Sequence, residues 1–144
     1  MVARRHNGNT YQEIAVVAAQ PLDVSQQYQG DAAGAGTVTA LTCPATPEVQ
    51  TIKASPGRLL GLYLVNTNAA IRWAKIYNIV APTLGSSTAA MRIPLPQNQP
   101  VFISFEGGMA FSTAITCAIT STAAINDSTG VVTADDVTGF SVHA

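Results

Sequence analysis

A two-residue alternation between Gly107 and Ser121 is the feature that most constrains the fold. Bulky side chains occupy every second position with small ones between them, which is the period of a β-strand and not of a helix. A strand of this kind needs a second layer over its bulky face, while its small face allows close approach of another sheet or a neighbouring subunit. We therefore expect a central strand here. Its bulky positions are Met109, Phe111, Thr113, Ile115, Cys117 and Ile119.

Two apolar segments raise the question of a membrane. The stretch from Gly107 to Asn126 carries no charged residue. However, Thr and Ser recur in it at strand spacing and Gly107-Gly108 is a turn signal, so we do not expect a transmembrane helix. The run from Ile14 to Ala19 is shorter than the roughly 7 to 15 apolar residues of a secretory signal. We expect a chain that is made in the cytoplasm, is not processed and has no membrane partner.

Short alternating segments separated by turn residues predict an all-β protein, a β-sandwich or jelly roll of about seven strands. Residues 1–47 contain too little apolar bulk for a core, and 26–36 is rich in Gly and Ala, so 1–47 is expected to be an extended arm and linker. Residues 48–144 are expected to form the sandwich. Its strands are predicted within 49–54, 58–66, 70–79, 91–95, 101–105, 107–121 and 131–142.

Three of these segments carry more specific expectations. The run 58–66 is apolar on both faces, which predicts a buried strand, and 70–79 is expected to pair back on it as a hairpin. Trp73 is expected to anchor the core in preference to forming a ligand platform. Prolines at positions 94 and 96 make 91–95 an edge strand.

The composition favours a protein that functions in contact with other proteins. Charged residues make up 10% of the chain, compared with about 25% in a typical soluble domain. The net charge is −1 and the pI is about 6.0, and the basic residues are scattered. Phosphate backbones are bound by a concentrated basic face, so we do not expect a nucleic-acid partner. A surface with so little charge predicts homo-oligomerisation or another protein partner.

No residue cluster predicts catalysis. The histidines, His6 and His143, lie near opposite ends of the sequence, so a nucleophile–histidine pair would have to be built from the two ends. Asp135 and Asp136 would face opposite sides of a strand. The segment 126–130 lacks the alternating acidic ligands of a calcium loop. We expect no enzyme, no cofactor and no bound metal.

The two cysteines, Cys43 and Cys117, are far apart in the sequence and no CxxC motif is present. A disulfide-based scaffold would be richer in cysteine, and zinc sites use closer spacings. Both are expected to be buried thiols.

Five short segments carry a resemblance to a known group of proteins. This pattern covers residues 57 to about 127 and resembles small virion proteins of tailed bacteriophages. Those are β-sandwich proteins of the head or tail, some of which act as decoration (cement) proteins. The resemblance implies a structural role at the capsid surface, with the major capsid protein or other virion proteins as partners. The segments are GRLLGLY at 57–63, AKIYN at 74–78, IPLP at 93–96, GMAFS at 108–112 and TCAIT at 116–120.

Two functions of different classes remain open. The first is a structural virion protein whose arm adds a strand to the exposed sheet edge of a neighbour, although the arm's 14–18 segment could instead pair with its own sandwich. The second is a carbohydrate-binding or tail-fibre module in which Tyr63, Trp73 and Tyr77 stack against a sugar. The partner-binding residues predicted in the arm are Tyr11, Ile14, Val16, Val17 and Leu22.

Overall fold

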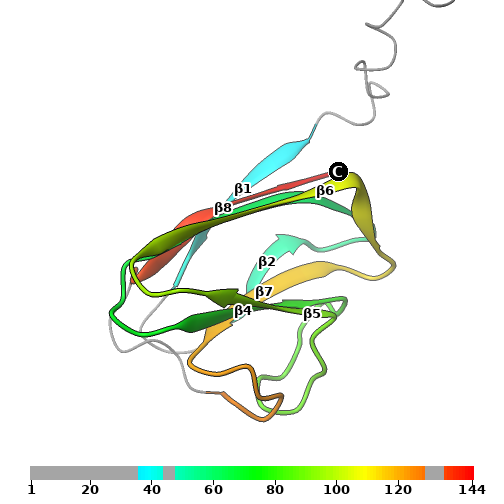
Figure 1. The fold of residues 1–144 in the computed structure, drawn as a ribbon. Coiled ribbons are helices and arrows are strands. Elements are labelled where there is room, and N and C mark those ends of the chain that lie inside the picture. Colours follow the sequence, from blue (N-terminus) through cyan, green and yellow to red (C-terminus); the bar gives the residue numbers. More distant parts are fainter. Residues whose placement is uncertain (1–35, 44–47, 129–134) are drawn as a thin grey trace, which may run out of the picture. The chain divides into compact units, whose positions relative to one another are not determined.

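The computed structural model describes residues 36–43, 48–128 and 135–144, and these form β-structure without a helix. The strands lie in two four-stranded antiparallel sheets, ordered β1-β8-β3-β6 and β2-β7-β4-β5. Figure 1 shows the two sheets as layers, one above the other. The all-β prediction is confirmed. The strands are β1 (Thr37–Thr42), β2 (Gln50–Lys53), β3 (Gly57–Asn66), β4 (Arg72–Tyr77), β5 (Met91–Leu95), β6 (Gln99–Phe111), β7 (Ile115–Thr120) and β8 (Val137–His143).

One hydrophobic core lies between the sheets and takes side chains from both. Alternate positions of each inner strand point inward, as the pleat requires. The bulky positions Ile115, Cys117 and Ile119 of β7 are among them, as the alternation predicted. The buried members of the core are Leu41, Cys43, Ile52, Leu59, Leu62, Leu64, Ala74, Ile76, Ile93, Leu95, Phe111, Ile115, Cys117, Ile119 and Val137.

The 107–121 alternation belongs to two strands and not to one. β6 ends at Phe111 in one sheet, the chain turns a corner, and β7 begins at Ile115 in the other. Asn78 holds the corner: its Oδ1 accepts from the backbone N–H of Thr113 at 2.8 Å, and its Nδ2 donates to Ser112 Oγ at 2.9 Å. The expected single strand was wrong because the alternation of side chains continues across the corner.

The small face of β7 is covered by the chain's own loops. Thr116 and Thr120 are fully buried. Thr116 Oγ1 donates to the carbonyl of Ile79 at 2.9 Å, and Thr120 Oγ1 donates to the carbonyl of Thr122 at 2.9 Å. The small face of β7 was expected to contact a second sheet or a neighbouring subunit, but these loop segments cover it instead.

Two further expectations about pairing are corrected. β3 and β4 do not form a hairpin, because β3 pairs with β6 and β8 while β4 pairs with β5 and β7. The sandwich also begins earlier than residue 48, since β1 pairs along its whole length with β8. β5 is at a sheet edge, as its prolines predicted. Residues 1–35, which hold most of the expected arm, lie outside the described part of the chain.

Both cysteines are thiols buried in the core. Burial raises the pKa of the Cys117 thiol from about 9 to about 12, and the neighbouring Cys43 contributes to the rise. Thiolate is the reactive form of cysteine, so this rise in pKa makes the Cys117 thiol much less reactive than an exposed one.

We therefore expect native protein at pH 8 to react with an aromatic disulfide reagent at Cys117 at least about a hundredfold more slowly than unfolded protein does. The measurement is the absorbance time course with and without denaturant, and Cys43→Ser isolates the Cys117 signal. Rapid reaction of the native Cys43→Ser variant, while it retains its β-sheet spectrum, would contradict this placement of Cys117.

Candidate docking face

The outer surface of the sheet β1-β8-β3-β6 carries a row of aromatic rings. Tyr63 of β3 is paired on one side with Phe140 of β8 and on the other with Phe102 of β6. Directly paired residues of antiparallel strands project from the same face, so the three rings lie side by side across the sheet. Ala40 of β1 extends the same row, opposite Phe140.

The rows on either side of the aromatic row are also uncharged. Val38 pairs with Val142 in one of them, and Val65 pairs with Pro100 in the other. We name this surface the aromatic face. It consists of Val38, Ala40, Thr42, Gly61, Tyr63, Val65, Pro100, Phe102, Ser104, Thr138, Phe140 and Val142, none of which is charged.

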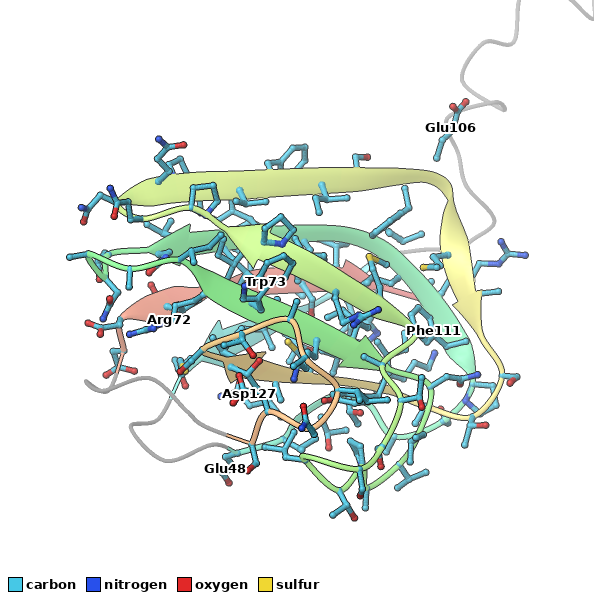
Figure 2. The ribbon with its side chains drawn as sticks, turned by 60° about the horizontal axis from the view of Figure 1, so that its bottom comes forward. Glu48, Arg72, Trp73, Glu106, Phe111 and Asp127 are labelled. Carbon is cyan, nitrogen blue, oxygen red and sulfur yellow. The ribbon has the colours of Figure 1, made fainter. Side chains whose placement is uncertain are left out.

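The apolar residues of the aromatic face are solvent-exposed to an unusual degree. Phe102 is 70% exposed, Val38 63% and Phe140 38%. Exposed aromatic side chains scattered singly are ordinary, but a contiguous uncharged group across four strands marks an interaction site. Charged side chains of this sheet lie beyond the aromatic face, where β6 bends: Arg58 of β3 contacts the carbonyls of Gly107 and Gly108, and Glu106 projects away from the sheet (Figure 2).

Two of the three rings are stacked on each other. The rings of Tyr63 and Phe140 are stacked on each other, with centroids 5.4 Å apart and planes inclined by 27°. One surface of each of these two rings is therefore covered by the other ring. Uncharged aromatic edges and aliphatic side chains are what a protein interface core contains.

The aromatic platform expected for a sugar does not form. Tyr63 lies in one sheet, whereas Trp73 and Tyr77 lie in β4 of the other. Tyr77 is 1% exposed. Trp73 is half-buried and does not belong to the core between the sheets, so its expected role as a core anchor was also wrong. It projects from the outer side of β4, in register with Pro94 and Thr120.

His143 is buried and links β8 to the neighbouring strand β1. It is buried in β8, and its Nε2 lies 3.0 Å from Thr39 Oγ1 of β1. Burial lowers the pKa of its imidazole, and the positive charge of Lys53 lowers it further.

Asp127, considered above as a calcium ligand, accepts through Oδ2 from the backbone N–H of Thr122 at 2.6 Å.

The sequence-predicted binding residues and the aromatic face are different parts of the chain. Tyr11, Ile14, Val16, Val17 and Leu22 lie outside the described residues. The aromatic face escaped prediction because Phe102 and Phe140 stand alone in their segments, and only the strand register brings them together around Tyr63. The available signal was weak: one aromatic residue at an outward position in each of the two strands.

Within the described residues, no helix has the length and apolarity to span a membrane. A scan against protein-family models, a search of curated proteins and a search of solved structures each find no match to this chain.

Proposed function

We propose that this protein is a structural component that binds other protein through the aromatic face. The observation that carries the proposal is the uncharged surface centred on Tyr63, with Phe102 70% exposed beside it. Burying such a surface contributes roughly 25 cal/mol per Å² of apolar area removed from water. The aromatic face contains no charge that would oppose this burial, so it can form the core of an interface.

The setting that we propose is the virion of a tailed bacteriophage. The resemblance of residues 57–127 to small virion proteins supports a head decoration protein that stabilises the capsid. Its partners would be the major capsid protein or other virion proteins, with copies of itself as an oligomer. It would be made in the host cytoplasm and reside on the capsid surface as a jelly-roll-like sandwich. The low charge of the whole chain is consistent with this setting.

The N-terminal segment has a proposed part in the same function. Residues 1–35 precede β1, which is an edge strand of the sheet that carries the aromatic face. An arm that begins at this edge can reach a neighbouring subunit and add a strand there through Ile14, Val16 and Val17. Tyr11 and Leu22 would supply additional apolar contacts.

Phe102→Glu tests the proposed function. A charge within an apolar interface is left without a partner, so we expect self-association, and binding to capsids assembled without this protein, to weaken at least about tenfold. Sedimentation velocity measures the first and cosedimentation with capsids the second. The fold should survive, because Phe102 is largely exposed.

Val80→Glu is the matched control, because Val80 is 53% exposed and lies in the loop after β4, outside the aromatic face. It should associate like the unmodified protein. If Phe102→Glu keeps full association with both itself and capsids, the aromatic face is not the docking surface.

A further inference from the structure

Two positive side chains stand directly opposite each other on the outer side of the second sheet. Lys75 of β4 is the register partner of Arg92 of β5. Like charges at directly paired positions of antiparallel strands repel and destabilise the sheet. The described part of the chain carries few basic residues, so this placement of two of them needs a physical reason.

Lys75 is held rigidly at this place. Its side chain is 1% exposed, and its ammonium donates to the carbonyls of Ala124 at 2.6 Å and Asp127 at 3.1 Å. An ammonium has three N–H donors, so one remains after these two bonds. Burial lowers the pKa of Lys75; the carboxylate of Asp127 opposes this effect, and Arg92 adds to it.

Arg92 approaches the same loop from β5. Its Nη1 donates to the carbonyl of Ala123 at 3.0 Å, which leaves most of the five guanidinium N–H donors for other acceptors. The loop 121–128 thus contacts both cations through backbone carbonyls. Figure 2 shows Asp127 in this loop, beside the strands of the second sheet.

A cavity of about 50 Å³ lies next to the two cations, lined by Lys75, Arg92, Ser87, Thr88, Ala89 and Ile125. One water molecule needs roughly 10 to 15 Å³ by the same measure, so a group of several heavy atoms fits. Ser87 Oγ accepts from the backbone N–H of Thr83 at 2.9 Å, and its hydroxyl proton is therefore available to an acceptor. The cavity combines two cations with two hydroxyl groups.

We propose that this cavity binds a small tetrahedral oxyanion of the phosphate or sulfate class between Lys75 and Arg92. Its oxygens would accept charge-assisted hydrogen bonds from the ammonium and the guanidinium, and further bonds from the hydroxyls of Ser87 and Thr88. A negative charge between Lys75 and Arg92 would attract both cations and offset their mutual repulsion, in addition to the attraction that Asp127 already exerts on Lys75. The bound anion would also tie the loops 82–90 and 121–128 to the sheet. This inference is independent of the proposed function.

The test compares thermal unfolding in sodium phosphate or sodium sulfate with unfolding in sodium chloride of equal ionic strength. We expect either oxyanion, at about tenfold excess over its Kd, to raise the Tm by about 5 °C. Isothermal titration calorimetry with inorganic phosphate gives the Kd. Equal Tm values in all three salts, with no heat of binding, would overturn the proposal.

Arg92→Gln separates a binding role from a structural one. Without oxyanion its Tm should equal or exceed that of the unmodified protein, because the repulsion of Lys75 is removed, and the response to phosphate should be lost. Arg92→Lys keeps the charge and should keep part of the response. Arg58→Gln is the control, since Arg58 contacts the carbonyls of Gly107 and Gly108 at another place, and it should respond fully. A phosphate response that persists in Arg92→Gln would show that the anion acts elsewhere.

Discussion

Asn66→Asp is expected to destabilise the protein strongly at neutral pH. Asn66 is completely buried at the end of β3. Its side-chain nitrogen donates to the carbonyl of Leu95 at 2.9 Å, at the end of β5, and to those of Pro96 and Ala70 at 3.1 and 3.0 Å. Its Oδ1 accepts from the N–H of Asn68 at 3.0 Å. Because β3 and β5 belong to different sheets, this side chain fastens one sheet to the other.

An aspartate at this position would replace the N–H donors of Asn66 with a negatively charged acceptor, so that attraction to the carbonyls becomes repulsion. Its carboxylate would face three carbonyl oxygens with no proton between them. We expect a cost of more than about 4 kcal/mol, a large part of the roughly 5 to 15 kcal/mol that stabilises a domain. Asn66→Ala, which only removes hydrogen bonds, should cost about 2 to 3 kcal/mol.

Urea unfolding followed by circular dichroism measures these differences. The burial and the carbonyls raise the pKa of the new carboxyl above its unfolded value, so the deficit of Asn66→Asp should shrink as the pH falls from 7 towards 4. Asn98→Asp is the control, because Asn98 is exposed with a φ of 52°, a conformation that aspartate tolerates. A loss below about 1 kcal/mol in Asn66→Asp would contradict the role of Asn66.

Gly139→Ala should have the second large effect. Gly139 lies in β8, between β1 and β3. A Cβ there would come within 1.9 Å of the carbonyl oxygen of Tyr63 and 2.9 Å of the Cα of Leu64. Both atoms belong to the backbone of β3, which cannot move without breaking the sheet. We expect a loss of at least about 3 kcal/mol, measured as a shift of the urea midpoint.

Gly107→Ala is the matched control for steric clash. A Cβ at Gly107 meets no atom within 4 Å, although its φ is 72°. Its cost should be limited to the strain of the left-handed conformation, about 1 kcal/mol. If both alanine variants lose the same stability, the close approach of β8 to β3 is not the cause of the Gly139 effect.

The sequence predicted the class of the fold because local periodicity reflects which faces are buried. The inward positions of β7 and the absence of a helix in the described chain follow from that pattern, and the edge position of β5 follows from its prolines. Pairing could not be predicted in the same way. β3 and β4 are neighbours in the sequence and both are apolar, yet each finds its partners elsewhere because each contributes to a different sheet.

The candidate sites depended even more on tertiary structure. Nothing in the sequence shows that Phe102 and Phe140 flank Tyr63, or that Lys75 faces Arg92, because strand register decides both. The prediction that Trp73 lies in the core was wrong for a related reason. Aromatic residues in strands are usually buried, but the core side of β4 is occupied by Ala74 and Ile76, which leaves Trp73 on the opposite side.

The position of β8 between β1 and β3 also determines the order of events during synthesis. Among the described strands, β1 pairs with β8 alone, and the contact of Thr39 with His143 spans 104 positions of the chain. While the ribosome is still making the intervening strands, β1 lacks its partner β8 and β3 is open along one edge. Closing such distant pairs is slow. The nascent chain should therefore be most prone to aggregation, and most dependent on chaperones, until β8 has emerged.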